Sequence, residues 1–333
     1  MIGYYIHHHG KGHLHRAAAI AAASSRPVVG LSSLPRPHEW VGPWVQLAQD
    51  SSGSTESVTA NGRLHWAPLG HPGHRDRMAE ISSWIRDVRP TLMVVDVSVE
   101  VVLLARLHGL PVVTVLQPGD RSDPVHELGY AVSAALIGCW PPDAGPVKLP
   151  ADIDESLIHE IGGLSRFEAQ SPRPEPTAGP VHAVVLTGGG GDDLTPERLD
   201  TIRQAQPEWR WTVLGTHGVW VDDPAGLLRT ADVVVTHAGQ NAIAEIAALR
   251  LPAVVLPQDR PHDEQRCLAG ALTSGPWPAF AAPSDDAGWA SVLDAARSAD
   301  GSGWASWCDG RAVDRFLAVC ESVALDPEED SDE

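Results

Sequence analysis

Short runs of apolar residues alternate with helix-forming segments along most of this chain, and the alternation restricts the fold more than any other feature. The clearest unit covers residues 91–116, where a strand at 91–96, a helix at 99–108 and a strand at 111–116 follow one another, with Gly109 ending the helix. A strand, a crossing helix and a second strand in this order pair in parallel through a right-handed connection. The sequence therefore predicts an α/β fold built on parallel sheets.

A proline-rich stretch divides the alternation into two series. Residues 171–176 read Ser-Pro-Arg-Pro-Glu-Pro, which neither a helix interior nor a central strand tolerates, and we assign residues 166–180 to a linker. Each flanking series, residues 1–165 and residues 181–324, is long enough to bury a core of its own. We expect two doubly wound, Rossmann-like domains that face each other across a cleft, with the last helix able to pack back on the first domain.

Composition disfavours several classes of protein. The formal net charge of −19 argues against binding to the nucleic-acid backbone, which needs concentrated lysine and arginine. The acidic residues 325–333 form a solvated tail that we expect to be disordered. The four cysteines show no CxxC spacing, which is typical of a reduced, cytoplasmic protein and predicts neither a disulfide framework nor a zinc site. No apolar run is long enough to span a bilayer, whereas contact with a membrane surface is left open.

Residues 236–245, Thr-His-Ala-Gly-Gln-Asn-Ala-Ile-Ala-Glu, place a turn of small residues between a strand and a helix. The turn at Ala238 and Gly239 lets backbone amides approach a phosphate, and the helix N-terminus adds partial positive charge. Glu245 lies about one helical turn further along, where its carboxylate can accept hydrogen bonds from ribose hydroxyls. His237 either donates a hydrogen bond to a phosphate oxygen or satisfies the local backbone. This pattern is typical of a site for a sugar nucleotide.

Two further segments follow strands of the second series. The glycines at 188–191 would let the backbone approach a pyrophosphate, or they form a flexible loop with no ligand. Their pattern matches neither a dinucleotide-binding loop nor a Walker loop. Residues 263–265, Asp-Glu-Gln, form a polar loop after a strand that ends at Pro257, and this loop can reach a hexose at the carboxyl edge of the sheet. The alternative is a helix start capped by Asp263.

The first series offers a candidate acid–base pair. His13 closes a glycine-rich turn at residues 10–13, where an imidazole that faces the cleft can act as a general base. Asp96 ends the buried strand and can orient His13 or bind an acceptor hydroxyl; the alternative is a helix cap. The N-terminal histidines at 7, 8, 9, 13 and 15 raise the question of a metal site, but no carboxylate or thiolate partner is identified for them, and no metal ion is expected.

Together these patterns resemble the glycosyltransferases of the GT-B fold, in particular the MurG-type (family 28) and glucuronosyltransferase-like (family 1) enzymes. The resemblance covers nearly the whole chain. It rests on the pattern His-x-Gly-x-Asn-x-x-x-Glu at residues 237–245, the acidic–glutamine pair at 264–265, the Gly-His turn at 12–13 and the segment 161–166. It implies that the glycine turn and its histidine meet the donor diphosphate, that the glutamate meets the ribose, and that the acidic–glutamine pair meets the donor sugar.

The function that this resemblance implies is transfer of a sugar from a nucleotide-sugar donor, with a UDP-sugar expected, to an acceptor hydroxyl in the N-terminal domain. The chemistry would need neither a metal ion nor a cofactor. The catalytic residues would be His13 and Asp96. The expected donor-binding residues are Gly12, Gly188, Gly189, Gly190, His237, Ala238, Gly239, Gln240, Asn241, Glu245, Glu264 and Gln265.

Two other functions stay open at this point. The run Gly-His-Leu-His-Arg at 12–16 also resembles the Gly-His-x-x-Arg turn of nucleotide-sugar hydrolases with the same fold, in which water replaces the acceptor. The other alternative is a sugar-nucleotide-binding protein without catalytic activity. The sequence does not indicate the acceptor, and the apolar and basic membrane-facing patch of the MurG type is not evident in it.

Overall fold

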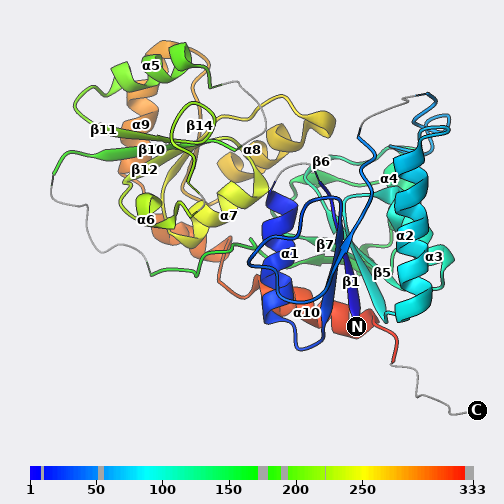
Figure 1. Cartoon of the computed structure of the whole chain (residues 1–333). Helices are drawn as coiled ribbons and strands as arrows, with labels where there is room; N and C mark the ends of the chain where they lie inside the picture. Colours follow the sequence, from blue (N-terminus) through cyan, green and yellow to red (C-terminus); the bar gives the residue numbers. More distant parts are fainter. Residues whose placement is uncertain (9–10, 52–55, 172–178, 189–193, 222, 327–333) are drawn as a thin grey trace, which may run out of the picture.

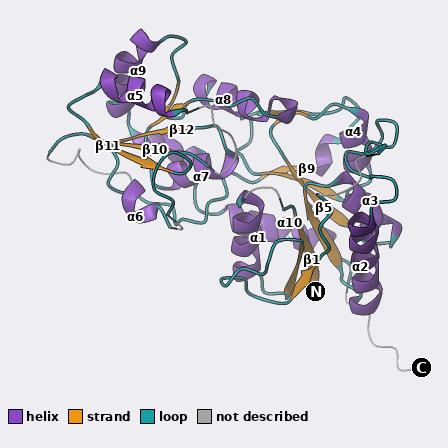
Figure 2. Cartoon of the chain, turned by 45° about the horizontal axis from the view of Figure 1, so that its top comes forward, coloured by secondary structure: helices purple, strands orange, loops and turns teal. Residues whose placement is uncertain are grey.

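The computed structural model describes residues 1–8, 11–51, 56–171, 179–188, 194–221 and 223–326. The chain forms two lobes that lie side by side in both views (Figure 1, Figure 2). Each lobe contains one large parallel sheet with helices packed on both of its faces. The expected α/β fold with two doubly wound domains is confirmed.

Seven strands form the sheet of the N-terminal lobe, and all neighbours in it are parallel. In spatial order they are β3 (Trp44–Gln46), β2 (Val28–Ser32), β1 (Ile2–Ile6), β4 (Leu92–Asp96), β5 (Val112–Leu116), β7 (Ala135–Gly138) and β9 (Ile158–Glu160). The inner strand β1 places Tyr4 opposite Gly30 of β2 and Val94 of β4. The order of the strands along the chain reverses at β1 and β4, which makes their carboxyl ends the topological switch point of this sheet.

Helices from both ends of the chain cover this sheet. They are α1 (Gly12–Ala23), α2 (Pro72–Val88), α3 (Val99–Leu107), α4 (Pro124–Ala131) and α10 (Ala312–Val323). The helices α2 and α3 pack on one face, around Ile81 and Val101, and α1 and α10 pack on the other, around Ile20 and Phe316. The helix α10 thus returns from the C-terminal lobe to lie beside α1 (Figure 1). Its Phe316 stacks on Tyr4 of β1, with ring centroids 6.3 Å apart.

The C-terminal lobe repeats this arrangement with five parallel strands. In spatial order they are β11 (Arg210–Leu214), β10 (His182–Leu186), β12 (Val233–Thr236), β13 (Ala253–Val255) and β14 (Ala279–Ala281). Its helices are α5 (Pro196–Ala205), α6 (Ala225–Leu228), α7 (Gln240–Ala248), α8 (Glu264–Ser274) and α9 (Trp289–Arg297). Leu199 and Leu293 anchor α5 and α9 to one face, and Ile243 and Leu268 anchor α7 and α8 to the other. Here the switch point lies between the carboxyl ends of β10 and β12.

Several shorter elements lie between these strands and helices. They are the paired strands β6 (Gly119–Asp120) and β8 (Val147–Lys148) and the 3₁₀ helices η1 (Glu155–Leu157), η2 (Pro261–Asp263), η3 (Asp286–Gly288) and η4 (Gly301–Ser306). Local sequence sets several helix starts: the Asp123 carboxylate caps α4 and the Thr195 hydroxyl caps α5, each followed by a proline at the first helical position. None of the described helices is both long and apolar enough to cross a membrane.

Some elements differ from the sequence-based expectations. The sequence pattern indicates no strands at 135–138, 158–160 or 279–281, because runs of three or four residues are too short to show a period. The polar loop expected at 263–265 is also wrong, since Glu264 begins the helix α8. Asp263 is left-handed, with φ of 53°, and its side chain makes no capping hydrogen bond.

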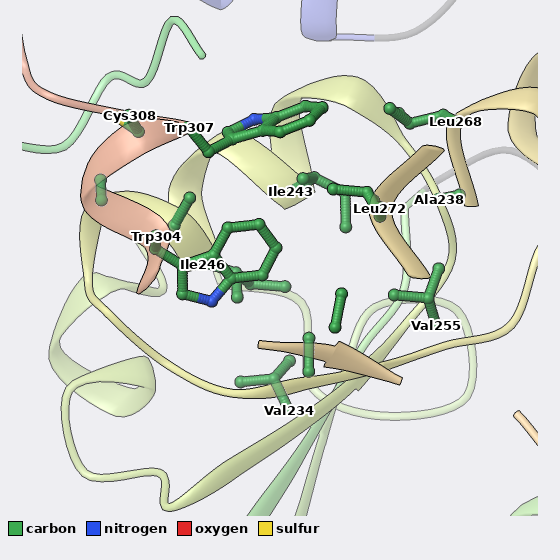
Figure 3. Close-up of a cluster of buried hydrophobic side chains, with 14 of the residues drawn as sticks. Val234, Ala238, Ile243, Ile246, Val255, Leu268, Leu272, Trp304, Trp307 and Cys308 are labelled. Atoms are coloured by element: carbon green, nitrogen blue, oxygen red, sulfur yellow. The ribbon is translucent and has the colours of Figure 1, made fainter. Parts of the chain in front are cut away.

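A tryptophan-rich cluster supports the back of α7. Trp304 lies in η4 and Trp307 directly follows it. Both pack against the buried face of α7, which carries Ile243 and Ile246 (Figure 3). Trp304 is fully buried, and its Nε1 donates a hydrogen bond to the carbonyl oxygen of Leu251 at 2.7 Å. Because the indole fills the space behind α7 and is also bonded to the chain that follows it, this cluster fixes the position of the helix and of the turn at its N-terminus.

Candidate active site

The predicted site residues lie at the switch points of the two sheets. In the N-terminal lobe, His13 follows β1 and Asp96 ends β4. In the C-terminal lobe, Gly188 follows β10 and His237 follows β12. Carboxyl ends of parallel strands at a switch point are where α/β proteins bind ligands. Here contacts of Arg16 with Gln240 and of Gly12 with Asn241 bring the switch points of the two lobes together.

The structure brings His13 and Asp96 together. The Nδ1 atom of His13 lies 3.0 Å from Oδ1 of Asp96, whose side chain is fully buried, while the imidazole keeps 19% of its surface exposed. An ionised carboxylate can only accept hydrogen bonds, so Nδ1 carries the proton and Nε2 has the free lone pair. This is the tautomer in which an imidazole can accept a proton from an incoming hydroxyl.

Arg16 connects this pair to the other lobe. Its guanidinium is buried and donates to Oδ1 of Asp96 at 3.2 Å and to Oε1 of Gln240 at 2.7 Å. Burial by itself raises the pKa of Asp96, but the positive charge of Arg16, together with His13, outweighs burial and lowers that pKa below its usual value. Asp96 is therefore ionised at neutral pH.

Two helix N-termini meet across the gap between the lobes. The helix α1 begins at Gly12 and α7 begins at Gln240, after Gly239. A Cβ added to Gly12 would lie 2.6 Å from Nδ2 of Asn241, so the two helix starts are in contact. Neither helix has an acidic residue in its first turn or a side-chain cap. Two partial positive charges beside the guanidinium of Arg16 form a field that favours a bound anion.

Glu245 lies on the same helix and faces the segment that leads out of the N-terminal lobe. Its Oε1 accepts a hydrogen bond from Nε of Arg166 at 2.7 Å. Burial raises the pKa of the Glu245 carboxyl, and Arg166 opposes that rise without cancelling it. Both residues line a small cavity between the lobes, together with His15 and Asn241.

His237 is buried at the start of the turn before α7. Its Nδ1 lies 2.8 Å from the carbonyl oxygen of Leu256, which can only accept, so this nitrogen carries the proton. A neutral His237 therefore presents an acceptor at Nε2, and only the imidazolium form could donate a hydrogen bond to a phosphate there. Ala238 is fully buried, and Nε2 of Gln240 is buried without a hydrogen-bond partner among the described residues.

The two residues of the acidic–glutamine pair, Glu264 and Gln265, lie in different surroundings. Oε2 of Glu264 lies 3.4 Å from a guanidinium nitrogen of Arg121, so this carboxylate faces the N-terminal lobe. Oε1 of Gln265 instead accepts a hydrogen bond from the backbone amide of Gln258 at 2.8 Å, which ties the loop after β13 to α8. In the glycine run, the carbonyl oxygen of Gly188 accepts a hydrogen bond from Oγ1 of Thr216 at 3.1 Å. The expected residues at 189 and 190 lie outside the described residues.

Comparison with known proteins finds similarity in the part of the chain that contains α7. Residues 219–273, a range that holds β12, α7 and nearly all of α8, match the model of the glycosyltransferase family 28 C-terminal domain. Over 150 residues the chain is 27% identical to the UDP-N-acetylglucosamine--N-acetylmuramyl-(pentapeptide) pyrophosphoryl-undecaprenol N-acetylglucosamine transferase of Shewanella baltica strain OS185. This alignment covers 37% of the chain, and the chain spans 41% of the length of that relative.

Solved structures extend the similarity to the whole chain. MurG of Acinetobacter baumannii superposes with a TM-score of 0.65 at 16% identity, covering 96% of this chain and 99% of that one. The glycotransferase of kitacinnamycin reaches 0.63 at 18% identity, with 96% and 98% covered. The calicheamicin glycosyltransferase CalG4 reaches 0.63 at 16% identity, with 97% and 99% covered. This chain has the GT-B glycosyltransferase fold.

In this GT-B fold, several residues of the site are ones that the sequence did not single out. In the sequence, Arg16 stands out only in the hydrolase-like turn, yet in the structure it joins the His13–Asp96 pair to α7. Arg166 and Arg121 bind the two carboxylates expected to meet the donor. Gln117 adds a longer contact to Asp96, at 3.4 Å. Gln117 and Arg16 reach Asp96 within the N-terminal lobe, from positions distant in sequence. The contacts of Arg16 with Gln240, of Arg121 with Glu264 and of Arg166 with Glu245 depend on how the lobes pack, so they leave no signal in local sequence.

Proposed function

We propose that this protein is a glycosyltransferase that moves a sugar from a nucleotide-sugar donor, in the first instance a UDP-sugar, to an acceptor hydroxyl. The observation that supports it most is the meeting of the two helix N-termini, at Gly12 and Gln240, beside the buried guanidinium of Arg16. A diphosphate is the anion that suits two helix ends and one guanidinium. The family 28 match falls on the α7 half of this arrangement, and the printed name of the Shewanella relative specifies a UDP-sugar.

In this proposal the parts of the donor are bound by successive turns of the C-terminal lobe. The diphosphate lies at Gly239 and the first amides of α7, where the helix dipole acts. The ribose hydroxyls donate to Glu245, which then exchanges its bond with Arg166 for bonds to the donor. The sugar lies toward Glu264, and Gln265 supports it indirectly by holding the loop after β13.

The acceptor hydroxyl is activated from the N-terminal lobe. Nε2 of His13 removes its proton while the hydroxyl oxygen, about 3–3.5 Å away from the anomeric carbon, forms the new glycosidic bond. The bond from that carbon to the diphosphate oxygen breaks, and the released diphosphate keeps the electron pair. Asp96 stabilises the imidazolium that forms on His13. The two helix ends and Arg16 stabilise the departing diphosphate, so no metal ion is required at that position.

The partners proposed are therefore a nucleotide sugar and a hydroxyl-bearing acceptor, with no redox or organic cofactor. The acceptor would bind on the N-terminal lobe beside His13, because that is where the base lies. We propose a reducing, cytoplasmic setting for the reaction, in keeping with the free thiols of all four cysteines.

A panel of sugar nucleotides tests the proposal. The melting temperature is measured with UDP-, dTDP- and GDP-sugars, because a ligand that binds only the folded state stabilises it by mass action. We expect a rise with UDP-sugars that Glu245→Ala abolishes. Unchanged melting with every donor would overturn the assignment. Release of free sugar in the absence of any acceptor, at a rate that added acceptors do not increase, would instead identify a hydrolase.

A further inference from the structure

Four side chains outside the proposed donor site converge where η2 approaches the N-terminal lobe. His65 lies in the segment before α2, Asp123 and His126 lie at the start of α4, and His262 lies in η2. One candidate ligand atom from each residue lies within 4.8 Å of all the others. The ring centroid of His126 lies 4.6 Å from that of His65 and 4.9 Å from that of His262. The proposed sugar transfer uses none of these residues.

Backbone contacts hold these side chains in place. Oδ1 of Asp123 accepts hydrogen bonds from two amides at the start of α4, at 3.0 and 3.2 Å, which turns Oδ2 toward the imidazoles. This Oδ2 lies 2.5 Å from Nδ1 of His126 and 3.8 Å from Nδ1 of His262. On the other side, the carboxylate of Glu100 accepts the backbone amide of His65 at 2.7 Å and so fixes its loop. The cluster is therefore positioned before any ligand binds.

Two features of the cluster destabilise the folded chain when no ligand is bound. Nε2 of His65 is buried and has no hydrogen-bond partner within the described ranges, and a buried polar atom of this kind needs an explanation. His262 has φ of 61°, a left-handed conformation that costs a residue with a side chain about 1–3 kcal/mol and is concentrated at functional sites. A shared ligand would account for both.

The charges beside the cluster favour a cation. The cavity next to it is lined by the carboxylates of Asp120 and Asp263 in addition to that of Asp123. Arg260 is the arginine in that lining, while Arg121 lies outside it, with a guanidinium nitrogen 3.5 Å from Nε2 of His126, and is paired with Glu264. Even with Asp120 paired to Lys148, carboxylates outnumber guanidiniums in this lining. The carboxylate of Asp123 turns its Oδ2 toward the imidazoles of His126 and His262.

We propose that His65, Asp123, His126 and His262 bind one divalent transition-metal ion, with zinc as the best fit. Neutral imidazoles and a carboxylate are ligands that zinc prefers, and four of them complete a tetrahedral shell. With bond lengths of about 2.0–2.1 Å, tetrahedral ligand atoms lie about 3.4 Å apart, so side-chain shifts of about 1 Å close the site. Three ligands come from the N-terminal lobe and His262 comes from the C-terminal lobe, so the bound ion joins the two.

This proposal does not depend on the proposed sugar transfer, and it is tested by binding alone. The chelator-treated full chain is titrated with Zn²⁺ against a chromophoric competitor, and with Co²⁺ followed by its visible absorption. We expect one tight ion per chain and the intense absorption of four-coordinate cobalt. His262→Ala and Asp123→Asn should each weaken binding at least tenfold, with circular dichroism showing that each variant is folded.

Two matched variants decide whether the site is the one proposed. His38→Ala removes an exposed histidine outside the cluster and should leave the affinity unchanged. The double variant His7→Ala/His8→Ala removes the N-terminal histidines that could compete for the ion, and it should also retain tight binding. Loss of tight binding in that double variant with retention in His262→Ala would overturn the proposal, as would the absence of any stoichiometric ion in the parent chain.

Discussion

Asp96 gathers three side chains at the end of β4. His13, Arg16 and Gln117 each place a nitrogen within 3.4 Å of its Oδ1. Burial alone would raise the pKa of this carboxyl, but the charge of Arg16 and the contact with His13 keep the group ionised. A carboxylate with a lowered pKa favours the tautomer of His13 that is protonated at Nδ1 and stabilises the imidazolium form. In the proposed mechanism Asp96 therefore acts on the base rather than on the substrate.

Replacing His13 by alanine tests the assignment of the base. In His13→Ala, kcat for sugar transfer should fall by about 10²–10⁴-fold, the usual contribution of general base catalysis. The Kd for UDP should stay within a factor of about two, because the diphosphate is bound by helix ends and Arg16. Steady-state rates with the donor that raises the melting temperature and calorimetric UDP binding measure both quantities. Full activity in His13→Ala would contradict the mechanism; His38→Ala is the matched control.

His15 gives a prediction about pH. Burial, reinforced by the charges of Arg166 and Lys11, lowers its pKa from 6.5 to about 4. Between these two values the unfolded chain binds a proton at this position and the folded chain does not, so the free energy of unfolding falls as pH decreases through this window. One such group contributes a slope of at most about 1.4 kcal/mol per pH unit.

The variant His15→Gln removes this contribution. Urea unfolding at pH 7, 6 and 5 should therefore show a shallower loss of stability in the variant than in the parent chain. The slopes of the free energy of unfolding against pH should differ between the two proteins by an amount that corresponds to the binding of at most one proton. Parallel pH profiles for the two proteins would show that His15 is not responsible.

At the scale of elements, the predictable parts are those whose signals are local. The helix expected at 99–108 is observed as α3 at Val99–Leu107, because Gly109, with φ of 80°, marks its end. The short strands β7, β9 and β14 could not be predicted, since their pairing depends on neighbours distant in sequence. The same holds for the site. His237 and Glu245 share one segment and one motif, whereas the contacts of Arg16 with Gln240 and of Arg166 with Glu245 exist only when the lobes pack together. The proposed metal-binding cluster likewise needs His262 of the C-terminal lobe to meet three residues of the N-terminal lobe.

The helix α7 owes its position to the tryptophans behind it, and this can be tested. Trp304→Ala would leave a large cavity against Ile246 and an unpaired carbonyl oxygen at Leu251. We expect the free energy of unfolding to fall by about 3–5 kcal/mol. Donor affinity should fall as well, because the turn proposed to bind the diphosphate shifts. Trp304→Phe, which keeps most of the volume but loses the hydrogen bond, should cost less. Denaturant unfolding measures both; equal losses would assign the effect to the hydrogen bond alone.

At the scale of the whole molecule, the chain passes between the two lobes twice. The connection out of the N-terminal lobe passes close to the end of η4: the amide of Gly163 donates to the carbonyl oxygen of Trp307 at 2.6 Å. Beyond that point the chain returns as α10, and Arg315 donates from Nε to the carbonyl oxygen of Ile161 at 2.8 Å. The two chain segments that connect the lobes are therefore hydrogen-bonded to each other at this crossing.

The return of α10 to the N-terminal lobe predicts which fragments of the chain can fold on their own. A fragment of residues 1–165 lacks α10 and exposes the apolar surface that Phe316 and Cys320 cover. Since deleting one buried phenylalanine side chain costs about 3–5 kcal/mol, a large share of ordinary domain stability, this fragment should be unfolded or aggregated. Joining residues 1–165 to 309–326 through a short glycine linker should restore a cooperative unfolding transition, because residues 163 and 307 are already adjacent. Circular dichroism and thermal unfolding of both fragments decide it; a stable, cooperative 1–165 fragment would show that α10 is dispensable for the N-terminal lobe.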